Sequence, residues 1–221
     1  MKLIIGNKNY SSWSLRGWLA LKAFNIPFEE INLTLFSDEF YTELAKHSPV
    51  GKVPVLVDGD LSVWDSLAIC EYLNENYLNG KGWPEDKNKR AVARSIVADM
   101  HSGLFAIRNE MPMNCRAKRS IELTGVAKKE IASLDKTWSR LRSENTQNGD
   151  YLFGTFSLAD VFFAPVAFRF ATYGVEMSDA SKAYINTMLA HPAMQEWLKG
   201  SREEKEIIDE AEVGREATSA L

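Results

Sequence analysis

The sequence has little cysteine, little histidine and no excess of basic residues, and each shortage excludes a class of function. Only two of its 221 residues are cysteines, and Cys70 and Cys115 lie far apart without metal-ligand spacing. We therefore expect no metal, and reduced thiols in a cytoplasmic protein are the simplest account. The formal net charge is −4 and no basic stripe is present, which argues against nucleic acid as a partner.

Long hydrophobic runs are also missing. None approaches the roughly 18 apolar residues of a membrane span, so no membrane partner is expected. The N-terminus, residues 1–6, has the pattern of a strand rather than a signal peptide, because its apolar run is short and no small-residue cleavage site follows. The hydrophobic fraction of 45% is typical of a globular protein, and the length fits one large or two modest domains.

Short strands alternate with helices before residue 79. The patterns predict strands at 3–6, 28–33, 53–57 and 61–64, and helices at 14–24, 38–46 and 67–77. The order βαβαββα indicates an α/β layer with a mixed sheet. Residues 1–78 are therefore expected to form the first domain.

Residues 79–86 are rich in turn formers and predict a linker, after which only helical patterns follow. Long helices are predicted at 88–116 and 120–145, another to about 173 with a kink at Pro165, and a last one over 191–198. Ser157 and Asp160 have the spacing of a capping box. Residues 87–221 therefore predict an all-helical domain without strands, and those after 201 are expected to be peripheral.

A proline lies inside residues 52–60, which otherwise have the pattern of a β-strand. Proline has no N–H to donate to a ladder, so Pro54 belongs at an edge, at a strand start or at a bulge. If the Val53–Pro54 bond is cis, the strand bends there and Val53 turns its N–H and C=O toward solvent, where an extended peptide can pair with them. An edge-strand proline without such a role is the alternative.

The next helix begins with Asp65 and Ser66. A helix N-terminus carries unpaired N–H groups and the positive end of the helix dipole, so it receives a carboxylate well. Residues 52–66 therefore combine a backbone clamp for a peptide with a carboxylate socket. An ordinary capped helix is the alternative, and this segment alone leaves both interpretations open.

Three motifs, in this order, give nearly the whole chain a resemblance to the cytosolic glutathione S-transferases. Val-Pro-Val-Leu at 53–56 matches the family's cis-proline site. Asp65–Ser66 matches the pair that holds the γ-glutamyl end of glutathione, and Ser157–Asp160 matches the capping box of the helical domain. The resemblance implies an N-terminal thioredoxin-like domain and a C-terminal helical bundle. It also implies glutathione as cosubstrate and a homodimer.

The resemblance places the chemistry after the first strand, in residues 9–16. Redox proteins of this fold carry C-x-x-C there, whereas this chain has Ser-Ser-Trp-Ser at 11–14, which excludes dithiol exchange at this position. A serine hydroxyl can donate to a thiolate, and the helix dipole adds positive potential, so both lower the thiol pKa of bound glutathione. We expect Ser11, with Ser12 as the second candidate, to stabilise the thiolate. Helix capping alone is the alternative.

The serine segment is similar to that of zeta-class transferases, in which Ser-Ser-Cys opens the helix. Trp13 replaces that cysteine, which argues against the cysteine-linked activities of the zeta and beta classes. Zeta enzymes that isomerise maleylacetoacetate carry an arginine late in the helix after the capping box. Thr172 falls at that position, and Arg169 lies one turn earlier. We expect Arg169 to be a surface or helix-packing residue, with carboxylate binding as the alternative.

Other positions follow from the same resemblance. Lys52 matches a lysine of theta-like members and is either a contact to the glycyl end of glutathione or a solvated loop residue. Asp99 and His101 lie in a run similar to one of beta-class enzymes. There, the acidic residue reaches the γ-glutamyl ammonium across the dimer interface and the histidine lies near the sulfur. A surface aspartate and an inter-helix histidine are the alternatives. Phe40 stands where a polar side chain usually holds the glycyl carboxylate.

Several large apolar residues belong to no motif that would identify a site or a substrate. Trp18, Trp138 and Trp197 fall on apolar helix faces and are expected in the core. Four further residues are expected to line an electrophile pocket or to belong to the core: Met100, Phe105, Met111 and Met113.

The sequence thus predicts a two-domain glutathione transferase. Val53, Pro54, Asp65 and Ser66 would bind glutathione together with Lys52 and Asp99, and the helical domain would supply an apolar cleft for a small electrophile. Two alternatives remain open. One is a glutathione-dependent isomerase, which would need a carboxylate-binding arginine in the cleft. The other is a non-catalytic binding protein that keeps the fold.

Overall fold

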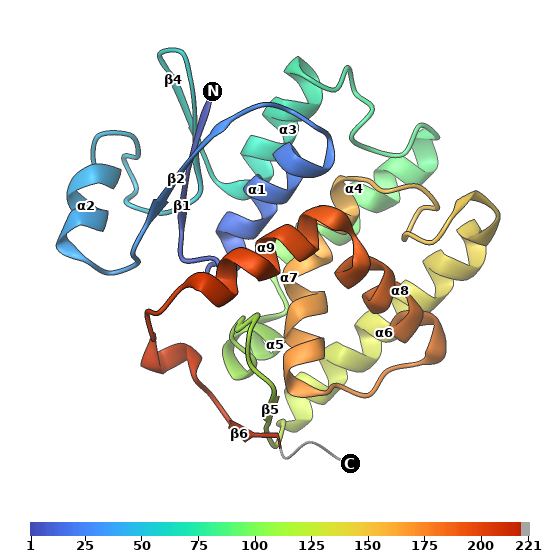
Figure 1. Cartoon of the computed structure of the whole chain (residues 1–221). Coiled ribbons are helices and arrows are strands. Elements are labelled where there is room, and N and C mark those ends of the chain that lie inside the picture. Colours follow the sequence, from blue (N-terminus) through green and yellow to red (C-terminus); the bar gives the residue numbers. More distant parts are fainter. Residues whose placement is uncertain (218–221) are drawn as a thin grey trace.

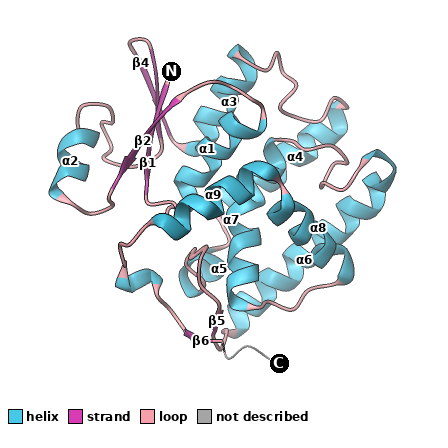
Figure 2. Ribbon diagram, viewed as in Figure 1, coloured by secondary structure: helices cyan, strands magenta, loops and turns pink. Residues whose placement is uncertain are grey.

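The computed structural model describes residues 1–217, with the strands of one sheet gathered on one side and a body of helices on the other (Figures 1 and 2). The N-terminal part has the predicted βαβαββα order. Its elements are β1 (Lys2–Gly6), α1 (Ser12–Ala23), β2 (Glu29–Leu33), α2 (Asp38–Leu44), β3 (Val55–Asp58), β4 (Leu61–Trp64) and α3 (Ser66–Asn76).

The sheet has the strand order β2-β1-β3-β4 and is mixed. β1 runs parallel to β2, and β3 runs antiparallel to β1 and to β4. Ile4 pairs with Ile31 on one side and with Val55 on the other, so β1 is a central strand. The predicted thioredoxin-like arrangement is thereby confirmed.

Helix α1 is buried almost all round, because it contacts β1 and α3 as well as α7 and α9 of the helical part. Leu15, Trp18 and Leu19 of this helix have no solvent-accessible surface. A helix that is apolar on most of its sides needs such enclosure on several sides. The start of α1, which carries the serine pair, is therefore fixed by both parts of the chain.

The helical part differs from the prediction at two places. Its helices are α4 (Lys87–Ser102), α5 (Phe105–Glu110), α6 (Gly125–Asn145), α7 (Leu158–Tyr173), α8 (Asp179–Ala190) and α9 (Pro192–Glu203), with short 3₁₀ turns η1 (Thr146–Asn148) and η2 (Asp209–Ala211). The single helix predicted over 88–116 is wrong, because Gly103 is extended and Leu104 takes a left-handed conformation with φ 52°. Helix α6 begins after Thr124, whose side chain caps it, rather than at residue 120.

The expectation of no strand in this part is also wrong. Two short strands, β5 (Arg119–Ser120) and β6 (Arg215–Glu216), pair antiparallel. β6 follows a C-terminal segment that runs back from α9 along the molecule (Figure 1). Residues 202–217 lie at the surface as predicted, since none of them is buried, but their strand β6 pairs with β5 there, and residues 218–221 lie outside the described part.

Helix α7 is the centre of the core. All of its residues are buried except Ala171, and it contacts α1, α4 and α8. The capping box predicted at Ser157 and Asp160 is present, and the helix continues through Pro165. Trp18, Trp138 and Trp197 are buried in the core as predicted. Within residues 1–217, no helix has both the length and the apolar character needed to span a membrane.

Candidate functional site

A cavity of ≈ 730 Å³ lies where the loop after β1, the segment before β3 and the turn before α3 meet. Three of the sequence motifs converge on it. Its lining includes the serine pair Ser11 and Ser12, Val53 with Pro54, and Asp65 with Ser66. The cavity therefore joins motifs that are more than fifty residues apart in the chain into one site.

The two serines differ in what their hydroxyl groups contact. Ser11 is the N-cap of α1: its Oγ accepts from the N–H of Ser14 and donates to Ser14 Oγ at 2.7 Å. The Ser14 hydroxyl in turn accepts from the N–H of Gly6. Ser12 Oγ instead accepts from Arg169 at 3.3 Å, and both serines are nearly buried. The capping alternative thus describes Ser11 but not Ser12.

The peptide bond between Val53 and Pro54 is cis, as expected. Strand β3 pairs only from Val55 onward, and none of the backbone hydrogen bonds found outside the regular elements of residues 1–217 involves Val53. The Val53 main chain, which lines the cavity, is therefore available to a ligand. Pro54 packs against Gly17 of α1, where an added Cβ would lie 3.3 Å from the proline ring.

Asp65 caps α3 and also reaches the helical part. Its Oδ1 accepts from the N–H groups of Leu67 and Ala68, while its Oδ2 lies 2.8 Å from Nε2 of His101 on α4. Ser66 is buried, and its hydroxyl has no partner among the described residues. The start of α3 therefore offers an unpartnered donor next to an acidic side chain.

Of the other residues that the sequence predicts at the site, some line the cavity and some do not. Lys52 is exposed and lines the cavity, and Phe40 is buried beside it. Asp99 is exposed on α4 and does not line the cavity. The three methionines expected at an electrophile pocket or in the core, Met100, Met111 and Met113, are core residues, and Phe105 is exposed.

Three arginines that are not among the predicted site residues lie near the serine segment, and of these the sequence suggests only Arg169, as an alternative carboxylate-binding residue. The Trp13 ring lies close to two of them, with the guanidinium of Arg16 at 4.3 Å and that of Arg108 at 4.7 Å from a ring centroid. Arg16 is buried, and burial together with the charge of Arg169 lowers its pKa to about 9. Arg108 lines the cavity itself.

Arg169 is not a surface residue. It is only 4% exposed, its Nε donates to the carbonyl oxygen of Met111 at 2.8 Å, and its Nη1 has no partner in the described chain. Burial and the nearby Arg108 lower its pKa to about 10. No salt bridge is found for Arg16, Arg108 or Arg169 within residues 1–217, so the serine end of the cavity carries uncompensated positive charge.

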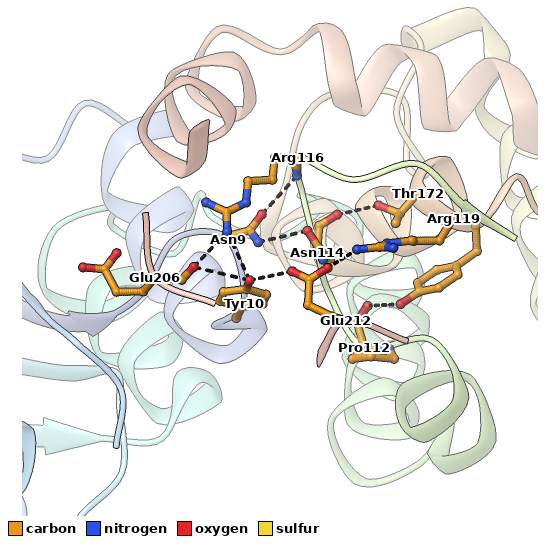
Figure 3. A network of polar contacts seen from close by, with 10 residues as sticks. Asn9, Tyr10, Pro112, Asn114, Arg116, Arg119, Thr172, Glu206 and Glu212 are labelled. Atoms are coloured by element: carbon orange, nitrogen blue, oxygen red, sulfur yellow. Dashed lines mark hydrogen bonds and ion pairs between the residues drawn. The ribbon is translucent and has the colours of Figure 1, made fainter. Parts of the chain in front are cut away.

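The C-terminal segment contacts the residue just before the serines (Figure 3). Tyr10 donates its hydroxyl to Glu212 at 2.6 Å, and Arg116 donates both to the Tyr10 hydroxyl and to the main-chain oxygen of Glu206. Burial and the Glu212 hydrogen bond raise the pKa of Tyr10. Tyr10 is therefore held as a neutral donor by a segment far along the chain.

Glu204 holds the same loop from its other side. Its carboxylate accepts from the N–H groups of Lys8, at 2.6 Å, and Asn9, at 2.9 Å. The Asn9 side chain donates to Asn114, which ties the loop to the helical part as well (Figure 3). Sequence reasoning missed this contact, because an isolated glutamate in a charged tail carries no local signal.

Comparisons with known proteins agree with this geometry. The family model described as the N-terminal domain of glutathione S-transferase matches residues 10–76, and the one described as its C-terminal domain matches residues 124–200. "Glutathione S-transferase Z1" of Arabidopsis thaliana is 35% identical over 171 residues, covering 72% of this chain and 74% of that protein.

Two further similar proteins are an isomerase and a transferase homologue of known structure. A "probable maleylacetoacetate isomerase" of Caenorhabditis elegans is 29% identical over 168 residues, with 76% of this chain and 77% of that protein covered. The crystal structure of a glutathione transferase homologue from Burkholderia, with bound glutathione, has a TM-score of 0.70 at 23% identity. The likeness covers 92% of this chain and 98% of that one, and it shows the shared fold.

Proposed function

Because the chain belongs to the glutathione S-transferase family, we propose that it activates the thiol of glutathione for attack on a small electrophile. The reaction is thiolate addition to, or displacement on, a carbon centre of a mainly apolar substrate. The thiol loses its proton to solvent when the thiolate forms. The new bond joins sulfur to the electrophilic carbon. In a displacement, the bond to the leaving group breaks and that group departs to solvent with the electron pair. In an addition, the π bond of the substrate opens and its far atom takes a proton from solvent.

Glutathione is proposed to lie along the N-terminal side of the cavity. The Val53 main chain pairs with the cysteinyl unit, and the start of α3 at Ser66 receives the γ-glutamyl carboxylate. Asp65 is the acidic neighbour for the γ-glutamyl ammonium, with Asp99 of a second subunit as a further source of charge. Lys52 approaches the glycyl end.

One observation carries this proposal: a single cavity brings together the free main chain of Val53, the unpartnered Ser66 hydroxyl and the serine pair at the start of α1. A tripeptide with a carboxylate at one end and a thiol in the middle matches that arrangement. The helix dipole of α1 and the nearby guanidinium groups favour the thiolate over the thiol.

Retention on glutathione-agarose, calorimetry and absorbance titration of the bound thiolate test the proposal. Ser66→Ala removes a hydrogen bond to a charged group, worth about 1.5 kcal/mol, so we expect roughly tenfold weaker binding. Ser95→Ala is the matched control, because the Ser95 hydroxyl lies on the exposed side of α4 and donates to the carbonyl of Ala91. A wild-type protein that neither binds glutathione nor lowers its thiol pKa would refute the proposal. The non-catalytic alternative would then hold.

A second candidate function, glutathione-dependent cis–trans isomerisation, is favoured by Arg108. This half-buried arginine lines the cavity, and its Nη1 donates to the carbonyl of Gly103 at 3.2 Å, the one hydrogen bond found for its guanidinium within residues 1–217. It can therefore receive a substrate carboxylate. If the protein is an isomerase, it turns over a cis-enedione diacid, and Arg108→Gln raises the KM of that substrate at least about tenfold. The KM of an uncharged electrophile stays the same.

We also propose a homodimer and a cytoplasmic location. An apolar groove on β4 and α3 includes Val63, Trp64 and Leu67, and the neighbouring Leu61 is 48% exposed. A second copy of this chain would cover that surface. Both cysteines are unpaired, which fits a reducing compartment.

A further inference from the structure

The hydroxyl groups of the two serines differ in whether their proton already has a hydrogen-bond acceptor. The Ser11 proton is donated to Ser14 Oγ, at 2.7 Å, inside the cap of α1. Ser12 Oγ accepts from Nη2 of Arg169, and no acceptor for its own proton is found among residues 1–217. Since a hydroxyl has one proton and accepts at its lone pairs, the contact with Arg169 occupies only the acceptor side of Ser12. Its proton remains available to the cavity that Ser12 lines.

Arg169 is held rigidly in place. It projects from α7, the most buried helix, and its Nε donates to the carbonyl of Met111. Two neighbours on α7 tie the same segment down, since Thr172 donates to the carbonyl of Asn114 and Tyr173 to that of Pro112. The guanidinium therefore reaches Ser12 from a fixed anchor rather than from a mobile side chain.

The charge of Arg169 lacks a counter-ion in the described structure. Its Nη1 is buried without a partner, and the charges of Arg108 and Arg16, which interact with it, have the same sign. A buried cation without an anion is costly and stabilises any negative charge that comes close. The cavity next to Ser12 is where the thiolate of bound glutathione is proposed to lie.

We propose that Arg169 is the positioning residue of the thiol site: it occupies the acceptor side of Ser12, so that Ser12, rather than Ser11, donates its proton to the glutathione thiolate. This inference rests on the proposed function, because it assigns the thiolate contact of that same site. Ser11 then serves as the structural cap of α1. The uncompensated charge of Arg169 adds to the positive potential around the sulfur.

The test is a double-mutant cycle read by the absorbance of the glutathione thiolate as a function of pH. Ser12→Ala and Arg169→Met should each reduce the thiolate fraction at neutral pH about tenfold, which corresponds to a rise of about one unit in the thiol pKa. Once Ser12 is alanine, Arg169→Met should have a smaller effect than in the wild-type background, because part of its action passes through the hydroxyl. Ser11→Ala should lower the melting temperature and leave the thiolate titration close to that of wild type.

Thr172→Val is the matched control for damage to α7. It removes a buried hydrogen bond from the same helix and should lower the melting temperature without changing the titration. If Arg169→Met does not fold, Arg169→Lys keeps the charge, and the comparison of Ser11→Ala with Ser12→Ala still decides which serine acts. Full additivity in the cycle, or a titration that depends on Ser11 instead of Ser12, overturns the inference while the proposed function stands. A wild-type protein without a lowered thiol pKa overturns the proposed function itself.

Discussion

Asp160 makes the stability of the fold depend on pH in an unusual direction. This carboxylate of the α7 capping box is fully inaccessible to solvent. It accepts from the N–H of Ser157 at 2.9 Å, the N–H of Leu152 at 3.2 Å and the hydroxyl of Tyr184 at 3.1 Å. Burial outweighs these hydrogen bonds and raises the pKa of Asp160 from 3.8 to about 6.

The sign follows from proton binding. Because the pKa is higher in the folded than in the unfolded chain, the folded protein binds the Asp160 proton more tightly between these two values. The stabilisation that Asp160 contributes to the free energy of unfolding is therefore complete below about pH 4, and it is lost as the pH rises through about 6. A pKa difference from 3.8 to about 6, at about 1.4 kcal/mol per unit, amounts to about 3 kcal/mol over the whole range.

Urea unfolding of wild type and Asp160→Asn, followed by tryptophan fluorescence, measures this effect. The free energy of unfolding of wild type minus that of the variant should fall by about 2 kcal/mol between about pH 4.5 and pH 7. Asp86→Asn is the control, because Asp86 caps α4 at the surface and its hydrogen bonds to Lys89 and Asn88 lower its pKa. For wild type and Asp86→Asn, the difference in the free energy of unfolding should stay constant above about pH 5. A difference that is constant, or that grows with pH, for Asp160 would show that its carboxylate is not penalised by burial.

Three further predictions concern the loop before α1, the cavity wall and the dimer. Glu204→Gln removes the charge from the hydrogen bonds to Lys8 and Asn9 and should cost about 1–2 kcal/mol in urea unfolding, with faster amide exchange in the loop; unchanged exchange would contradict it. Trp13→Leu removes the ring that contacts two guanidinium groups, so it should lower the free energy of unfolding by about 1–2 kcal/mol and also lower the KM of bulky electrophiles; a higher KM would show that the ring binds substrate. Leu61→Arg should convert the proposed dimer to a monomer in sedimentation analysis, and a dimer that persists would place the interface elsewhere.

Local patterns were sufficient for most of the N-terminal part. The strands and helices there follow from periods of two and 3.6 residues interrupted by turn residues, and their order is as predicted. The capping box at Ser157 and Asp160 was also readable, because its hydrogen bonds join residues within one turn of helix. The long helix expected over 88–116 failed where Gly103 and Leu104 change the backbone conformation, a break that an apolar stripe continuing on both sides conceals.

The site shows the same division. The sequence by itself marked two of the segments that reach the cavity, Val53 with Pro54 and Asp65 with Ser66, because their residue types have particular backbone or capping behaviour. The serine pair was placed there by the resemblance to the family. The sequence could not tell Ser11 from Ser12, since both stand at the start of one helix.

Only the tertiary structure decided what surrounds those segments. Arg169 meets Ser12 across 157 residues of chain, and Glu204 meets Lys8 across 196. Such contacts depend on how α7 packs against α1 and on where the C-terminal segment runs, which are collective results of burying the core. A local pattern shows which face of its own helix or strand a residue occupies. It does not show which distant side chain will pack against that face.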